Sequence, residues 1–277
     1  MKHYLKLVHF EFDRFAKLYL TLIMVTIAMQ FIGVIINANS YLRMANYSIH
    51  EHHMSTEAFL RDYGRMSFEQ ISNSLWFAAP IALSIAALIF YCFLIWYRDW
   101  FGKNTFIYRL LMLPTARLNI YLSKATSIFL MVLGLISLQL ILLPLEHRLM
   151  QFIVPFSLRT DYSLHEMVLS FRYLEVLYPN TFTEFILHYG LGFMVVFVLF
   201  TVIMFERSYR WKGMVFGVLY GIFTMCLFLA PVILVFILEN EYLYPMELLI
   251  LEVILGLAVI AISIWVSHYL LKNKITV

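Results

Sequence analysis

The sequence is poor in the residues that interrupt or cross-link a soluble fold. In 277 residues it has two cysteines, 10 glycines and 7 prolines, and only 13% of its residues are charged, against about a quarter in an ordinary soluble domain. Cys92 and Cys226 lie inside apolar runs, where packing as small apolar side chains is the expected role rather than a disulfide or a metal pair. The lack of low-complexity tracts and of repeats with a fixed period argues against linkers, solenoids and disorder.

Apolar side chains dominate instead. They make up 62% of the sequence, and the mean hydropathy is +0.82. A spanning helix needs roughly 20 apolar residues to cross about 30 Å of hydrocarbon. Six runs meet this requirement, so we predict one all-α polytopic membrane domain over residues 1–277. The predicted transmembrane helices are 18–38, 75–97, 119–143, 185–205, 214–238 and 247–271.

Lysine and arginine are distributed unevenly among the connecting segments. Fourteen of the 20 lie in the N-terminal segment, residues 98–124, residues 206–213 and the C-terminal segment, and the other six lie in 39–74 and 144–184. Because cytoplasmic loops are enriched in these residues, the sequence predicts that both termini are cytoplasmic and that 39–74 and 144–184 are extracellular. The expected location is the inner (cytoplasmic) membrane of a bacterial-type cell.

The first 17 residues carry a pattern of their own. A cleavable signal peptide ending near Ala38 is the competing interpretation, but its leader would be too long. One helical face carries charged and polar residues and a neighbouring face carries apolar ones, which predicts an interfacial amphipathic helix over 1–17 that contacts anionic lipid. The polar face has Lys2, Lys6, His9, Asp13 and Lys17, and the apolar face has Leu5, Val8, Phe12, Phe15 and Tyr19.

The segment 99–117, between the second and third predicted spans, is more organised than a simple connector. Residues 106–112 are apolar enough for a short helix, Pro114 ends it, and Thr115 is placed to cap the next helix. An exposed apolar knob with one charge would suit a groove on another protein, and an interfacial helix lying on lipid is an equal alternative. The knob residues are Ile107, Leu110, Leu111 and Met112 with Arg109.

From Tyr108 to Lys124 the sequence resembles the permease subunits of type-2 ABC exporters. The shared signature is a Leu-Pro pair at Leu113 and Pro114, two further residues, Arg117, and a lysine seven residues later. Those subunits also have six spans, cytoplasmic ends and an N-terminal interfacial helix. Their outer elaboration often lies between spans five and six, whereas here that link is only 239–246.

The resemblance implies that the segment 99–117 holds a coupling helix, at about 104–113, that rests on a separate cytoplasmic ATPase subunit. It also implies two ATPase copies and a second permease subunit, identical or related. This chain has no G-x-x-x-x-G-K-[ST] phosphate loop, so ATP, Mg and hydrolysis are expected on the partner, and no cofactor or catalytic residue is expected here. The implied partner-binding residues are Tyr108, Arg109, Leu110, Leu111, Met112, Leu113, Pro114, Arg117 and Lys124.

Two features lie within the later spans. Gly213, Gly217 and Gly221 form two G-x-x-x-G steps that indicate close helix packing, within the subunit, across a dimer, or by chance. Glu252 lies about one turn into the sixth predicted span, and a carboxylate at that depth is a candidate for the transport pathway or a snorkelling side chain. Nearby acids would form an acidic mouth that favours cationic substrates. These acids are Glu239, Glu241 and Glu247.

Other polar residues have plainer interpretations. His50, His52 and His53 need further ligands to hold a metal, and we predict no metal site. Gln139 and His188 lie within spans, where hydrogen bonds between helices are the expected role. A cluster of Glu206, Arg207 and Arg210 is expected to face solvent or headgroups, with a second ATPase contact as the sharper alternative. The spacing of apolar residues in 164–177 predicts an outer helix.

The leading hypothesis is a permease subunit that exports a hydrophobic or amphipathic peptide, lipid or drug. An ion-coupled secondary transporter would show inverted repeats, broken helices and midplane acids. A membrane hydrolase would show paired carboxylates, H-E-x-x-H or a Ser-His pair at a common depth. A non-transporting sensor or accessory subunit is the remaining alternative, and no nucleic-acid partner is expected.

Overall fold

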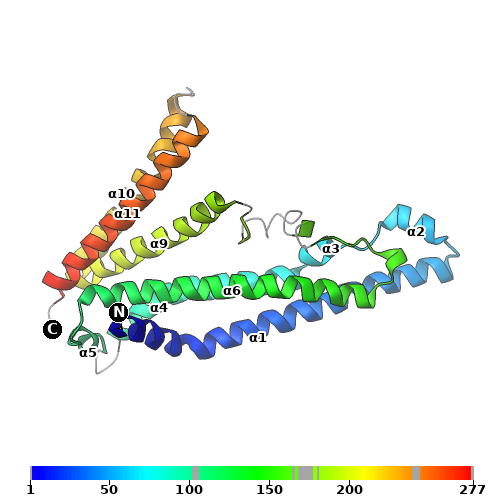
Figure 1. Cartoon of the computed structure of the whole chain (residues 1–277), viewed down its shortest axis with the longest axis horizontal. Helices are drawn as coiled ribbons and strands as arrows, with labels where there is room; N and C mark the ends of the chain where they lie inside the picture. The colour runs from blue at the N-terminus through cyan, green and yellow to red at the C-terminus, as the bar shows by residue number, and fades with distance from the viewer. Residues whose placement is uncertain are drawn as a thin grey trace. The chain divides into compact units, whose positions relative to one another are not determined.

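The computed structural model describes residues 2–101, 106–163, 166–167, 177–179, 181–238 and 244–275. These residues form helices and loops without a strand, apart from one isolated β-bridge between Met66 and Arg159. Six of the helices are long and apolar enough to cross a membrane, which confirms the predicted number. They are α1 (Lys2–Asn46), α4 (Leu75–Trp100), α6 (Arg117–Ile153), α9 (Phe182–Tyr209), α10 (Trp211–Leu238) and α11 (Pro245–Asn273), shown in Figure 1.

Helix α1 is continuous from Lys2 to Asn46, so the prediction of a separate helix over 1–17 is wrong. The reason is local: the first glycine is Gly33 and no proline occurs in α1, so nothing in the sequence ends the helix near residue 17. Leu7 and Val8 are buried, whereas Lys6 and His9 on the polar face are exposed. Contact of that face with lipid stays a prediction.

Helices α1 and α6 are longer than a bilayer requires. Helix α6 has 37 residues, about 55 Å at about 1.5 Å per residue, against a hydrocarbon thickness of about 30 Å. It continues past the predicted end at 143, with Pro144 inside it. The remaining short elements are η1 (Tyr47–Glu51), α2 (Thr56–Tyr63), α3 (Phe68–Ser72), α5 (Phe106–Leu111) and η2 (Phe156–Leu158).

The chain forms two compact units, and α1, α4 and α6 contribute residues to both. Unit 1 comprises Met1–Arg14, Ile89–Leu130 and Thr181–Val277, and unit 2 comprises Phe15–Leu88 and Met131–Asn180.

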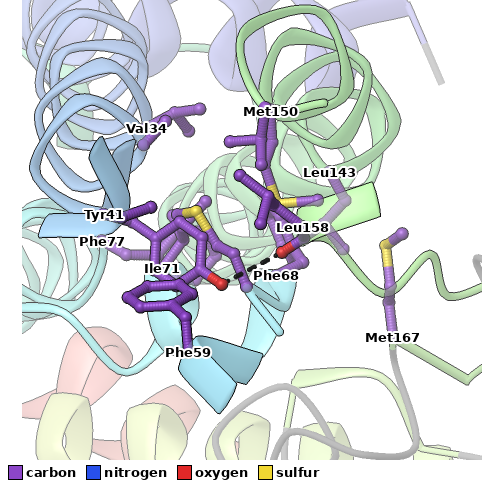
Figure 2. Close-up of a cluster of buried hydrophobic side chains, with 14 of the residues drawn as sticks. Val34, Tyr41, Phe59, Phe68, Ile71, Phe77, Leu143, Met150, Leu158 and Met167 are labelled. Carbon is purple, nitrogen blue, oxygen red and sulfur yellow. Dashed lines mark hydrogen bonds between the residues drawn. The ribbon is translucent and has the colours of Figure 1, made fainter. Parts of the chain in front are cut away.

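Unit 2 packs the two long predicted outer segments against each other. The Met66 N–H donates to the Leu158 carbonyl at 2.9 Å, and the Thr160 N–H donates to the Met66 carbonyl at 2.8 Å. The Tyr41 hydroxyl donates to the Leu158 carbonyl at 3.2 Å, and Figure 2 shows Tyr41 within the surrounding apolar cluster. Most of the predicted helix at 164–177 lies outside the described residues. The cluster, called the outer core below, contains Val34, Ala38, Tyr41, Ala45, Phe59, Met66, Phe68, Ile71, Phe77, Leu143, Met150, Val154, Leu158, Met167 and Tyr178.

One polar contact inside unit 2 was predicted from the sequence. The Gln30 side-chain amide donates to Gln139 Oε1 at 3.0 Å, which confirms a hydrogen bond between helices at Gln139. His188 is exposed. Cys92 is buried, Cys226 is exposed, and both are free thiols.

In unit 1, helices α10 and α11 both pack on α9. Arg210, with φ of +54°, is the one residue between α9 and α10, and the turn that it makes brings the two helices together at once. A Cβ at Gly213 would lie 2.7 Å from Phe205 C and 2.9 Å from Glu206 Cα, and one at Gly217 would lie 3.0 Å from Val202 Cγ1. Both glycines therefore permit close packing of α10 on α9 within this chain.

Candidate partner-docking site

A short helix, α5, lies where the sequence predicts one. It covers Phe106–Leu111, and Pro114 follows before α6 begins at Arg117. The predicted cap by Thr115 is wrong: among the described residues its Oγ1 has no hydrogen-bond partner, and the first turn of α6 closes instead from the Asn119 N–H to the Ala116 carbonyl at 2.8 Å.

The two faces of α5 differ from the prediction. Ile107, Leu110 and Leu111 were expected to be exposed, but they are buried, with exposed fractions of 0%, 5% and 6%. Their spacing places them on one helical face, and that face packs into this chain. The outward face carries a mixed apolar and cationic surface, called the docking face below. It consists of Tyr108, Arg109, Met112, Leu113 and Pro114, all of which are exposed.

Helix α5 is attached to the N-terminal turns of α1. The Phe10 and Phe106 rings stack at 5.7 Å between centroids, and the Arg14 guanidinium lies 5.1 Å from each centroid. Beside this contact is a pocket of about 290 Å³, with exposed His3 and Lys6 among its lining residues. The other lining residues are Leu7, Phe10, Phe106, Leu110, Leu113, Pro114 and Thr115.

Five charged residues from α1, α4 and α6 meet behind α5. The Lys124 ammonium contacts Glu11 Oε1 at 2.6 Å and Asp99 Oδ2 at 2.5 Å. Arg14 contacts Asp99 Oδ1 at 2.7 Å, and Arg98 contacts Glu11 Oε2 at 3.2 Å. We call these five residues the charged cluster. Three cations and two carboxylates give it a formal charge of +1.

The two carboxylates and Lys124 are almost fully removed from solvent, while Arg14 and Arg98 at the edge of the charged cluster are 22% and 25% exposed. The side chains of Lys124 and Asp99 are both 0% exposed, and that of Glu11 is 3% exposed. An ammonium has three N–H donors, and here a third acceptor, the Ile95 carbonyl, lies at 2.9 Å. Complete pairing of this kind is what allows charges to be buried, since an unpaired charge in the interior is very costly.

Sequence reasoning missed Glu11 and Asp99, and it assigned Lys124 to a partner. A usable signal was present: Lys124 lies inside a predicted span, and a charged residue at such depth calls for a partner of opposite sign. Nothing local identifies that partner, because Glu11 is 113 residues away in the sequence.

Arg117, the other charged residue of the signature, also binds within the chain. Its Nη1 donates to the carbonyls of Leu271 at 2.6 Å and Ile275 at 2.9 Å. The last carbonyls of a helix have no partner inside it, so Arg117 satisfies the C-terminal end of α11. The contact of Arg117 and Lys124 with an ATPase stays a prediction, but each has an internal role in the structure.

We expect Arg117→Ala to loosen the end of α11 by about 1–2 kcal/mol, since two hydrogen bonds from a partly exposed charge are lost. The measurement is amide hydrogen exchange of residues 268–275, which should become several-fold faster. Arg43→Ala, at an exposed arginine in unit 2, is the control and should leave that exchange unchanged. Unchanged exchange in Arg117→Ala itself contradicts the role.

The predicted solvated cluster at 206–210 is corrected in part. The Tyr97 hydroxyl donates to Glu206 Oε2. The Arg207 guanidinium lies 4.6 Å from the Tyr97 ring centroid, 5.6 Å from that of Trp100 and 5.5 Å from that of Phe101. Glu206 and Arg207 therefore join α9 to the end of α4, while Arg210 is exposed.

The remaining polar candidates are scattered. Glu252 is half-buried in α11, and Glu247 accepts a hydrogen bond from the Tyr244 N–H at 3.0 Å, as a capping residue. Glu239 and Glu241, predicted in the same acidic mouth, lie outside the described residues. Where the chain is described, no group of three or more His, Cys, Asp or Glu is placed to hold a metal ion.

At this end of unit 1, arginine and lysine contacts connect α5 to α1, and α1 to α4 and α6. Arg14 takes part in both sets of contacts, because its guanidinium lies over the Phe106 ring of α5 and pairs with Asp99 of the charged cluster. No protein-family model, curated protein or solved structure matches this chain, so its function has to be inferred from its own residues.

Proposed function

We propose that this chain is the membrane-spanning permease subunit of an ABC exporter, which moves a hydrophobic or amphipathic substrate outward while a separate cytoplasmic subunit hydrolyses ATP. The observation that carries the proposal is α5. One face of this short helix is buried and attached to α1, while the other is exposed, within the stretch that bears the Leu-Pro, arginine and lysine signature.

The docking face indicates the chemistry of its partner. Tyr108, Met112 and Leu113 offer apolar contacts, and Arg109 offers a cation. Among the described residues, Arg109 takes part in no ion pair. Lys6, at the adjoining pocket, adds a second cation, and none of the described residues that line that pocket is an acid. The matching surface on the ATPase is an apolar groove with at least one carboxylate at its edge.

In the proposed mechanism, two permease subunits, identical or related, enclose the path, and two ATPase subunits lie on the cytoplasmic side. ATP binding and hydrolysis move the ATPases, and each moves the α5 helix that it holds. The charged cluster passes this motion to α1, α4 and α6, which alternately expose the path to the two sides. The aromatic and aliphatic character of the spans suits an apolar or amphipathic cargo.

The test is co-purification in mild detergent, followed by an ATPase assay. We expect the ATPase activity that co-purifies with the double variant Arg109→Glu, Met112→Asp to be at least about tenfold lower than with the wild type. The double variant reverses the charge and removes apolar contact. Arg43→Glu, a charge reversal at an exposed site in unit 2, should retain the ATPase.

Both variants must elute from size exclusion as the wild-type permease does, which separates a lost contact from lost folding. Undiminished ATPase with a correctly folded double variant contradicts the docking role of α5. Absence of any ATPase from the wild-type preparation contradicts the proposed function as a whole.

A further inference from the structure

Helix α6 carries a carboxyl group into the outer core of unit 2. Glu146 is 0% exposed, and in the described part of the chain neither of its carboxyl oxygens has a hydrogen-bond partner. It follows the predicted third span, 119–143. It is also 29 residues beyond Arg117, the first residue of α6. That distance is about 44 Å along the helix, which exceeds the hydrocarbon thickness of about 30 Å.

The helical spacing around Glu146 places it on the inward face. Leu143 and Met150, three residues before and four residues after it, belong to the outer core and lie close to its other members in Figure 2. Away from this face, Leu145 and Phe152 are 48% and 90% exposed. Glu146 therefore lies on the helical face that packs into the outer core. The described titratable members of that core are Tyr41, whose hydroxyl donates to the carbonyls of Gly64 and Leu158, and Tyr178, whose hydroxyl donates to the Ile136 carbonyl.

No described cation of the surrounding elements is placed to neutralise Glu146. On α6 itself, Arg148 is exposed, and His147 is buried with its Nε2 2.9 Å from Gln151 Nε2 and 4.0 Å from Asp161 Oδ1. Arg159 is bound to Asp161 at 2.9 Å and to the Gln151 and Val154 carbonyls.

Among the described residues, the other elements of unit 2 add no buried charge. The charged side chains described there are exposed, and the part of α4 in this unit, 75–88, has none. The exposed charged residues of α1, α2, α3 and the α2–α3 loop in this unit are Lys17, Arg43, Glu57, Arg61, Asp62, Arg65 and Glu69.

From this arrangement we infer that Glu146 is a proton-binding site: the carboxyl holds a proton while the outer core is packed, and its ionisation loosens that packing. An ionised carboxylate without partners is far more costly in an apolar site than a neutral acid. The inference rests on the burial of Glu146 and on its two unpaired oxygens, and it does not depend on the proposed transport function.

The direction of the pH dependence follows from linkage. Burial raises the pKa of the Glu146 carboxyl from 4.5 to about 8. A folded-state pKa above the unfolded one means that the folded chain keeps the proton longer, so this contribution to stability is complete below about pH 4.5 and is lost as the pH rises to about 8.

The experiment compares thermal unfolding of the full-length wild-type and Glu146→Gln proteins in detergent across that range. We expect the wild-type midpoint to fall by roughly 5–10 °C between about pH 6 and pH 8 relative to Glu146→Gln, which mimics the neutral acid and cannot ionise. Glu69→Gln, at an exposed carboxylate of α3, is the matched control and should keep the wild-type profile.

A second measurement reports the proton itself. Infrared absorption of a protonated carboxyl should be present in the wild-type protein near neutral pH and absent from Glu146→Gln. If Glu146→Gln does not fold, Glu146→Met, which also removes the charge, takes its place in both measurements. Parallel pH profiles of the wild type and the neutral variant, or a protonated-carboxyl band that survives the substitution, overturn the inference.

Discussion

Replacing Asp99 by alanine is expected to destabilise the folded protein by about 3–5 kcal/mol, the range for breaking a buried ion pair by removing one partner. Asp99 is 0% exposed and pairs with both Lys124 and Arg14. After the substitution, Glu11 would be the one carboxylate shared by the three cations of the charged cluster, and the formal charge would rise from +1 to +2. The measurement is the thermal unfolding midpoint of the purified protein in detergent.

The formal charges of the cluster also predict how the stability losses at Lys124 and Asp99 compare. Removing Lys124 leaves two arginines facing two carboxylates, because Arg14 still contacts Asp99 and Arg98 still contacts Glu11. Lys124→Met should therefore cost less than Asp99→Ala, although a fully buried ammonium is deleted. The double variant Asp99→Ala, Lys124→Met restores the charge to +1, and its loss should be smaller than the sum of the single losses by about 1–3 kcal/mol.

Asp13→Ala is the matched surface control. Asp13 is an acid on α1 whose side chain is 59% exposed, and it lies 3.3 Å from the exposed imidazole of His9. Its removal should change stability by less than about 0.5 kcal/mol. If Asp99→Ala melts like Asp13→Ala, or if the losses of the double variant simply add, the charged cluster does not act as one paired group.

The number of spans and the position of α5 could be predicted because their signals are local. An apolar run of about 20 residues indicates a span wherever it occurs, and Pro114 restricts the backbone around it. The predicted break after residue 17 failed because an amphipathic pattern followed by an apolar one does not require the helix to end. Here no glycine or proline ends it, and α1 runs on to Asn46.

The charged cluster could not be predicted, because it depends on tertiary contacts. Asp99 and Lys124 are 25 residues apart and Glu11 is far from both, and no spacing rule connects three separate helices. The exposure of Leu110 and Leu111 was wrong for a related reason. An apolar helical face has the same sequence pattern whether it contacts lipid, a partner or its own chain, and here the chain itself covers it.

These contacts also change what the signature between Leu113 and Lys124 contributes. Its two charged residues bind inside the chain, Arg117 to the end of α11 and Lys124 to α1 and α4. Its exposed part includes Leu113 and Pro114, which share the docking face with Arg109 and Met112. In the proposed permease, the signature therefore supplies both a docking face and the rigid support behind it, which is what transmission of a partner's motion requires.

A methyl group added at Gly213 is expected to disrupt the packing of α10 on α9. An alanine Cβ there would collide with the Phe205 carbonyl oxygen, and would lie 2.7 Å from Phe205 C and 2.9 Å from Glu206 Cα. All three are backbone atoms, which cannot rotate away as a side chain can, and the adjacent turn at Arg210 leaves little freedom to separate the helices. We expect Gly213→Ala to cost about 3 kcal/mol, the upper part of the usual range for overpacking.

Gly221→Ala is the matched control in the same helix and the same G-x-x-x-G pattern. Its Cβ would lie 3.8 Å from Val202 Cγ2, an ordinary contact. It should be neutral or stabilising by up to about 1 kcal/mol, because alanine favours a helix more than glycine does. Relative to the wild type in the same detergent, the thermal midpoint should therefore fall in Gly213→Ala and stay the same or rise in Gly221→Ala. Equal midpoints of the two variants would show that α9 and α10 are not held this closely.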